Sequence, residues 1–324
     1  KVVYTKFNDY KPRSEVASAA SGGKLALVDR VEWNYFPDQS TAMNALISGE
    51  VDFFESPAND LVPILDASPD ITVEVNDPLG NIGFMRFNHL LPPFDNLAIR
   101  RAAIMSVKQE DYLTGAVGDS KFWKTCYSVY PCGTPMENDA GSDIISTASI
   151  DAAAAALKAA GYDGTPVLIM QPTDIPLLSS FSLITAERLR QVGFEVDLQA
   201  MDWSTLTSRR ALRDPVADGG WNIFHTWWIG ADVMDPMAIA FSGNPDAGWF
   251  GWPTDSELEV ARASFATASS KSEKQALATK AQERLWAIGA SAQLGQFFTP
   301  VAYNNNVKGL IKSPVQFFWN MSVE

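Results

Sequence analysis

The stretch from Val167 to Gln199 restricts the fold of this chain more than any other. It contains one apolar strand-like run, Val167 to Met170, and a second, Phe194 to Gln199. Between them lies a helical pattern, Leu177 to Val192, which ends at Gly193, and glycine just after the last helical residue is a common helix stop. A strand, a helix and a strand in this order form a βαβ unit with two parallel strands. The sequence therefore predicts an α/β fold.

The segment before this unit shows the same alternation of strands and helices. The expected strands are Val2 to Tyr4, Val28 to Trp33, Val51 to Phe54 and Ile71 to Val75, and the expected helices are Ala42 to Ile47 and Asp60 to Leu65. Asp38 to Thr41 offer polar N-cap residues for the first helix, and Gly49 ends it. These elements again indicate an α/β layer.

The chain changes character near Gly80. Gly80 to Asn88 is strand-like, Pro92-Pro93 ends this strand, and Asp95 or Asn96 caps the helix that follows. The later expected elements are helices at Ile150 to Ala160 after the N-cap Ser149, Thr205 to Leu212, Asp255 to Ala266 and Lys271 to Ile288, then a returning segment, Gln293 to Tyr303, and a closing run, Phe317 to Asn320. We expect a first lobe in residues 1–80, a second lobe in residues 81–297 and a return to the first lobe in residues 298–324. The expected crossings are Gly80 to Asn88 and Gln296 to Thr299.

The stretch from Trp221 to Trp252 holds five of the ten tryptophans and no lysine or arginine. Its opening run, Trp221 to Trp228, predicts a strand that leads into a turn at Gly230, and Asp235 with Pro236 predicts the start of a short helix. Ligands bind α/β proteins beyond the carboxyl ends of strands. In this interpretation the ligand site has apolar walls formed by Trp227, Trp228, Trp249 and Trp252. The carboxylates of Asp232 and Asp235 are fixed anions that bind a cationic group of the ligand. The alternative is that these tryptophans are core residues.

The charge balance argues against two classes of partner. Lys+Arg 25 against Asp+Glu 38 gives a net charge of −13, and an acidic surface disfavours nucleic acid and an anionic membrane surface. No apolar run approaches about 18 residues, so no transmembrane helix is predicted. The start, KVVYTKFNDY, lacks the apolar core of a signal peptide. We therefore expect that a leader has been removed or that the chain begins in mid-protein.

Two cysteines, Cys126 and Cys132, stand in the segment CYSVYPC and nowhere else. Together with only two histidines they lack the ligand number of a structural zinc site, and no metal site is predicted. The interpretation is a disulfide, which is worth about 2 kcal/mol on the chain-entropy model and implies an oxidising compartment. The alternative is two unrelated free thiols.

Four segments, in this order along the chain, carry a family resemblance: FPDQSTAMNALISGEVDFFE, FNHLLPPFDNLAIRRAA, LRQVGFEVDLQAMDW and WWIGADVMDP. Together they resemble the extracytoplasmic solute-binding proteins of peptide-type ABC importers, which include oligopeptide-, dipeptide- and nickel-binding proteins. The resemblance implies a two-lobed architecture like that of type II periplasmic binding proteins, whose lobes close over a ligand. It corresponds to the C-terminal two-thirds of such a protein, so we expect an incomplete first lobe.

The resemblance also implies a function. We expect a periplasmic, monomeric component that captures a small solute, above all a short peptide or peptide-like compound, in an interlobe cleft. It would deliver this ligand to the membrane subunits of an ABC permease, and no cofactor is implied. Nickel chelates, opines and sugars are alternative ligands of the same scaffold.

Individual residues of the family site can be matched to this chain. Asp232 matches the Trp-x-x-Asp context of the aspartate that meets a peptide's amino terminus in peptide-binding relatives, and Trp228 corresponds to the aromatic residue before it, with one residue inserted. Dipeptide-binding relatives also carry an arginine between the strand and the helix of the βαβ unit, where this chain reads MQPTDIPLL. We therefore consider Arg86, Arg209 or Arg210 as a substitute for binding a ligand carboxylate, with an ordinary surface or interlobe charge as the alternative.

An enzyme is the competing class. Asp232 and Asp235 would be a carboxylate pair for glycoside hydrolysis. The G-x-S-x-G motif of serine hydrolases is absent, and His89 and His225 are too far apart in sequence to suggest a metal site. His225 is expected to be a satisfied core or lining residue. The sequence therefore favours a binding protein over an enzyme.

Overall fold

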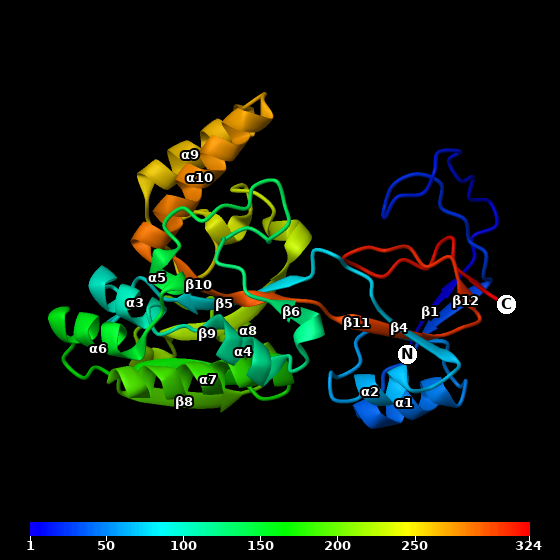
Figure 1. The fold of residues 1–324 in the computed structure, drawn as a ribbon, viewed down its shortest axis with the longest axis horizontal. Helices are drawn as coiled ribbons and strands as arrows, with labels where there is room; N and C mark the ends of the chain where they lie inside the picture. Colours follow the sequence, from blue (N-terminus) through cyan, green and yellow to red (C-terminus); the bar gives the residue numbers. More distant parts are fainter. The chain divides into compact units, whose positions relative to one another are not determined.

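The computed structural model describes all 324 residues, which form two compact units. Unit 1 comprises Lys1–Gly80 together with Phe298–Glu324, and unit 2 comprises Asn81–Phe297. Each unit combines β-sheet with packed helices (Figure 1), so the predicted α/β class is confirmed.

Unit 2 is built around a six-stranded mixed sheet with the strand order β6-β10-β5-β9-β7-β8. Its strands are β5 (Asn81–Phe87), β6 (Trp123–Lys124), β7 (Val167–Pro172), β8 (Val196–Met201), β9 (Ile223–Ile229) and β10 (Ser291–Phe297). β7 is parallel to both β8 and β9, whereas β5 is antiparallel to β9 and β10. The predicted βαβ unit is therefore confirmed as β7, α7 and β8.

The helices of unit 2 cover this sheet and extend from it. They are α3 (Leu97–Ile104), α4 (Gln109–Ala116), α5 (Asp143–Ser146), α6 (Ile150–Ala159), α7 (Pro176–Val192), α8 (Trp203–Arg209), α9 (Ser256–Thr267) and α10 (Lys271–Ile288). α7 packs against β7, β8 and β9, α4 packs against α7 and β10, and α9 packs against α10 (Figure 1). As a result every residue of β10, and every residue of β5 after Asn81, is buried.

Local side-chain chemistry explains where several helices begin and end. Of the two candidates Asp95 and Asn96, Asn96 is the cap of α3 and accepts a hydrogen bond from the backbone N–H of Ala98. The predicted cap Ser149 accepts one from the backbone N–H of Ala152. Gly193 ends α7 in the left-handed conformation, with φ at 108°.

Unit 1 is smaller and contains short pieces of sheet. Its elements are β1 (Val2–Thr5), β2 (Arg30–Trp33), α1 (Gln39–Ile47), β3 (Phe53–Phe54), α2 (Val62–Asp66), β4 (Ile71–Val75), β11 (Pro300–Asn304), β12 (Val307–Lys308) and β13 (Ser322–Val323). β11 lies between β3 and β4 and is antiparallel to both. The core of unit 1 is formed by Met43, Leu46, Leu65, Ile71 and Ala302.

Like β2 and β3, the predicted strands β8 and β9 begin two residues later than the sequence pattern indicated. Before β8, the Phe194 ring packs against Tyr162, with the ring centres 5.0 Å apart. Before β9, the side-chain oxygen of Asn222 accepts a hydrogen bond from the backbone N–H of Leu168 at 2.9 Å. At both places the strand-like composition therefore begins two residues before the regular backbone pairing.

The prediction of a helix that begins at Pro236 is wrong. A short 3-10 helix, Gly230–Val233, ends before this proline, and another, Ile239–Phe241, begins after it. The Asp235 carboxylate accepts a hydrogen bond from the backbone N–H of Met237 at 2.8 Å. An aspartate that binds the N–H two residues ahead closes a turn, so Asp235 stabilises a turn here rather than the first turn of a helix.

Candidate functional site

β9 positions two of the predicted site tryptophans. Trp227 and Trp228 lie opposite Gly83 and Ile82 on β5, and both tryptophans are half-buried. Because successive residues of a strand point to opposite faces of the sheet, the two rings lie on different faces. Asp232 follows in the 3-10 helix after β9, where its side chain is exposed.

Trp228 lies beyond the carboxyl ends of the two strands that run parallel to β9. Met170 on β7 is opposite Phe224 on β9, and β7 ends two residues later at Pro172. β8 ends level with β7, because Met201 is opposite Pro172. Trp228 is therefore at the edge of the parallel strands where α/β proteins bind ligands.

Trp249 lies against this end of β9. Its ring centre is 5.1 Å from that of Trp228, 5.4 Å from that of Phe224 and 5.7 Å from that of Phe250. The side chain is half-buried. The structure thus brings Trp228 and Trp249 together, although 20 residues separate them in the sequence.

Trp252 is buried more deeply than Trp228 and Trp249. It is 5% exposed and belongs to the core cluster of Leu168, Met170, Leu206, Trp221, Phe224 and Trp252. Its ring centre lies 5.9 Å from that of Trp221. This burial places Trp252 in the core, which is the alternative that the sequence left open for each tryptophan.

Arg86 is completely buried on β5 and binds backbone carbonyl groups. Its Nε donates to the oxygen of Phe250 at 2.6 Å, and its Nη1 donates to the oxygens of Ala240 and Ala290 at 3.2 and 3.3 Å. Burial lowers the pKa of Arg86 to about 9. Its carbon Cζ lies 5.3 Å from the Trp249 ring centre. Arg86 therefore connects Ala240 and Phe250 with Ala290, the residue before β10. Its side chain has no exposed surface.

The two arginines at the end of α8 differ in their partners. Arg209 donates to the oxygens of Gly219 and Gly220, at 2.7 and 2.8 Å, and to the side-chain oxygen of Gln199 at 2.7 Å. Arg210 is half-buried, and its guanidinium group makes no hydrogen bond. Burial lowers the pKa of both arginines. Of these two arginines, only Arg210 has a guanidinium group that makes no hydrogen bond.

Four aromatic rings surround the Arg210 guanidinium group. Its Cζ lies between 4.8 and 5.6 Å from the ring centres of Phe250, Trp203, Phe224 and Trp249. Arginine in front of an aromatic face is attracted by the negative charge of the ring face. This arrangement is not visible in the sequence, because the four rings come from α8, β9 and the loop before α9.

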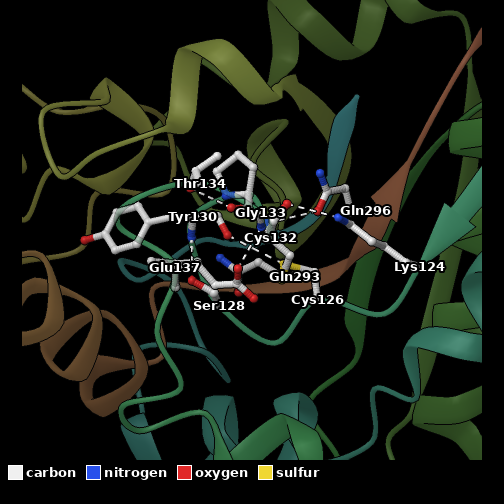
Figure 2. The surroundings of a disulfide bond; sticks show 12 residues. Lys124, Cys126, Ser128, Tyr130, Cys132, Gly133, Thr134, Glu137, Gln293 and Gln296 are labelled. Carbon is white, nitrogen blue, oxygen red and sulfur yellow. Dashed lines mark hydrogen bonds between the residues drawn. A yellow bond between two sulfur atoms is a disulfide. The ribbon is translucent and has the colours of Figure 1, made fainter. Parts of the chain in front are cut away.

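The disulfide between Cys126 and Cys132 is present, which confirms the prediction. Figure 2 shows its loop beside β10, with side-chain amides around it. The backbone N–H of Cys126 donates to the side-chain oxygen of Gln109 at 2.7 Å, and that of Cys132 donates to the side-chain oxygen of Gln296 at 3.0 Å. The Gln109 side-chain nitrogen in turn donates to the backbone oxygen of Gln293 at 3.0 Å. The loop is therefore held by hydrogen bonds as well as by the covalent bond.

His225 is a satisfied core histidine, as predicted. It is completely buried, its Nδ1 lies 3.0 Å from the hydroxyl oxygen of Ser182, and its Nε2 lies 2.8 Å from that of Thr185. Burial lowers its pKa to about 3. The structure contains no group of three or more His, Cys, Asp or Glu side chains that could hold a metal ion, and no helix long and apolar enough to span a bilayer.

Comparison with known proteins shows which family and which relatives this sequence matches. Residues 1–251 match the family model described as bacterial extracellular solute-binding proteins, family 5 Middle. A curated relative, the Probable peptide ABC transporter periplasmic-binding protein y4tO of Sinorhizobium fredii, is 34% identical over 324 residues. This alignment covers 98% of this chain and 61% of the relative, so the chain spans less than two-thirds of the relative's length.

Two solved structures share the fold. The ABC transporter substrate-binding protein CtaP from Listeria monocytogenes has a TM-score of 0.81 at 17% identity, over 99% of this chain and 63% of CtaP. The periplasmic binding protein DppA from Helicobacter pylori, in complex with the peptide STSA, has a TM-score of 0.78 at 19% identity, over 99% of this chain and 60% of DppA. Since the family model matches most of its length, the chain belongs to the family 5 bacterial extracellular solute-binding proteins.

Proposed function

We propose that this chain is the main part of a periplasmic solute-binding protein that captures a short peptide or peptide-like compound and delivers it to the membrane subunits of an ABC importer. Its family membership and the name of its Sinorhizobium fredii relative support this function. In this proposal the protein binds its ligand without turnover and acts as a monomer.

One observation on the molecule itself carries the proposal. Trp228 and Trp249 pack together in a half-buried cluster beyond the carboxyl ends of β7 and β8, and Asp232 follows on the exposed turn after β9. Aromatic faces provide apolar contact area, and a solvated carboxylate can pair with a ligand ammonium group. This is the combination that a peptide backbone with a free amino terminus requires.

The first experiment identifies the ligand. Full-length protein purified without refolding is analysed by native mass spectrometry, and a copurified peptide is the expected result. A copurified nickel chelate, opine or sugar would replace the peptide as ligand, and hydrolysis of a copurified or added glycoside would replace binding by catalysis.

The second experiment tests Asp232. Asp232→Ala is expected to weaken peptide binding by about 2–5 kcal/mol, as the removal of one partner of a desolvated charge pair does, while the melting temperature stays unchanged because the side chain is exposed. Asp246→Ala is the matched control, since Asp246 is also an exposed carboxylate of the tryptophan-rich stretch. A lowered melting temperature with unchanged affinity for Asp232→Ala would exclude the proposed role.

A further inference from the structure

We propose that the disulfide between Cys126 and Cys132 is a reversible redox site, and that its reduction by a small dithiol weakens ligand binding by unit 2. This inference rests on the proposed function, because its effect is on ligand affinity. The proposed function itself assigns no role to this bond. The chain has no other cysteine, so no second thiol of the protein can exchange with either sulfur.

The two cysteines of the bond differ in exposure and in charge environment. Cys126 is 2% exposed, whereas Cys132 is half-buried. Lys124 lies beside Cys132, because its Nζ donates to the carbonyl oxygen of Cys132 at 3.0 Å (Figure 2). A positive charge stabilises a nearby thiolate. An external thiol therefore reaches the bond at Cys132, and Lys124 favours the later release of that sulfur as a thiolate.

The reduction consists of two exchange steps. A thiolate of the dithiol attacks the sulfur of Cys132, forms a mixed disulfide with it and releases Cys126 as a thiolate. The second thiolate of the reagent then attacks the reagent sulfur of the mixed disulfide and releases Cys132. The two thiol protons of the reagent end on the two cysteines, and the two electrons come from the reagent, which becomes a cyclic disulfide. Exchange with an added disulfide runs in the opposite direction and restores the bond.

Hydrogen bonds from outside the loop hold it when the bond is broken. Gln109 on α4 and Gln296 on β10 accept the backbone N–H groups of the two cysteines, at 2.7 and 3.0 Å. Gln282 on α10 accepts the backbone N–H of Val129 at 3.0 Å. Reduction therefore loosens the loop without unfolding unit 2, which is what a reversible switch requires.

Tyr130 is the side chain through which the loop contacts the interior of unit 2. It is completely buried, and Figure 2 shows its ring pointing away from the disulfide. Its ring centre lies 5.7 Å from that of Phe241, in an edge-to-face arrangement, and its hydroxyl group donates to the carbonyl oxygen of Ala278 at 2.9 Å. Because Tyr130 lies inside the covalent ring that the disulfide closes, the bond restricts the position of this side chain.

Phe241 continues this contact toward Trp249. The residue before it, Ala240, accepts a hydrogen bond from Arg86 Nη1 at 3.2 Å. The Cζ atom of Arg86 lies 5.3 Å from the ring centre of Trp249, and the Nε of Arg86 donates to the carbonyl oxygen of the residue after Trp249 at 2.6 Å. The loop and Trp249 are therefore joined by a continuous set of contacts. A loosened loop lets the Trp249 ring shift from its place against Trp228, and the oxidation state of the bond is the switch that biases this packing.

The test measures ligand binding by the full-length protein in both oxidation states. The probe is a mixture of tripeptides without cysteine, and native mass spectrometry measures their binding before reduction, after reduction with dithiothreitol and after reoxidation with oxidised glutathione. Thiol counting on the native protein is expected to find both cysteines free after reduction. Reduction is expected to weaken binding about fivefold or more, as typical coupling between sites does, and reoxidation is expected to restore it.

Variants assign the effect to the bond and to Tyr130. The double variant Cys126→Ala and Cys132→Ala should bind as weakly as the reduced wild type and should not respond to dithiothreitol. Tyr130→Ala should bind weakly in both oxidation states, whereas Tyr130→Phe keeps the ring against Phe241 and should keep the redox effect. Tyr127→Ala is the matched control, since Tyr127 belongs to the same loop but is only half-buried, and it should also keep the redox effect.

The outcomes separate this inference from the proposed function. Three results would overturn the redox site and leave peptide binding intact: no free thiol in the native protein under dithiothreitol, unchanged binding after reduction, or a full redox effect in folded Tyr130→Ala protein. If the tripeptides bind in neither state, the peptide function fails, and amide hydrogen exchange decides about the site. Faster exchange of residues 239–250 in the reduced than in the oxidised wild type supports it, and equal exchange rejects it.

Discussion

The Nε2 atom of His225 lies 2.8 Å from the hydroxyl oxygen of Thr185, inside the core of unit 2. The other ring nitrogen, Nδ1, lies 3.0 Å from the hydroxyl oxygen of Ser182. Burial lowers the pKa of this histidine to about 3, whereas an exposed histidine has a pKa of about 6.5. The folded protein therefore keeps His225 neutral under conditions in which the unfolded chain would be protonated.

We predict that acid destabilises the protein through His225. Between about pH 6.5 and pH 3 the unfolded state binds a proton that the folded state does not, so the free energy of unfolding falls by up to about 1.4 kcal/mol per pH unit. Denaturant unfolding at pH 7, 5 and 4 measures this slope. His225→Gln keeps a polar amide between the two hydroxyl groups and is expected to reduce the slope, while His89 contributes equally to both proteins. Identical slopes for the variant and the wild type would contradict the prediction.

The disulfide is expected to stabilise unit 2 modestly. Replacing Cys126 and Cys132 together by alanine should lower the free energy of unfolding by about 2 kcal/mol on the chain-entropy model, and the loop should keep its path through the bonds to Gln109 and Gln296. Thermal unfolding checks the stability. Thiol counting in denatured, unreduced wild-type protein is the control, and two reactive thiols per chain would mean that the bond is absent.

Asp255 is expected to be far more important for stability than its neighbour Glu257. Asp255 is 8% exposed, accepts the N–H of Leu258 at 2.7 Å as the N-cap of α9, and pairs with Arg284. Asp255→Ala should cost about 1–3 kcal/mol. Glu257 lies 3.7 Å from the same Arg284 but is exposed, so Glu257→Ala should change stability by less than about 0.5 kcal/mol. Equal losses in urea unfolding would rule out the capping role.

Gly251 is expected to tolerate no side chain. A Cβ atom there would lie 2.4 Å from the carbonyl oxygen of Phe87 and 2.8 Å from Arg86 Nε, at a φ of +97°. At Gly193, φ is +108° and no atom lies within 4 Å of the added Cβ. Gly193→Ala should therefore cost about 1–2 kcal/mol for the backbone alone, and Gly251→Ala about 1–3 kcal/mol more through the clash. A melting temperature of Gly251→Ala no lower than that of Gly193→Ala would contradict this account.

The sequence predicted those parts of the fold that depend on neighbouring residues. Asn96 and Ser149 cap helices, and Gly193 ends one, because these effects act over three or four residues. The prediction of a helix at Pro236 was wrong for a related reason. An aspartate before a proline suits both a helix start and a turn, and the sequence alone does not decide between them.

The candidate site was less predictable than the fold. A dense group of tryptophans indicates burial or binding, but the three-dimensional path of the chain decides which ring has which role: Trp252 is in the core, and Trp249 is beside Trp228. The unpaired guanidinium group of Arg210 depends on rings that are more than 40 residues apart in sequence, from Trp203 to Phe250. The resemblance to a family gave Asp232 and Trp228, whose roles stay predictions.

The antiparallel pairing of β5 with β10 has a consequence for the order of folding. Asn81 and Phe297 are opposite each other on these strands, so the folded unit 2 starts and ends at one place. In unit 1, β4 must pair with β11 across the whole of residues 81–297. In an unfolded chain that closure costs loop entropy and is slow, whereas a folded unit 2 reduces the gap to a few residues. Unit 1 is thus expected to complete its folding after unit 2.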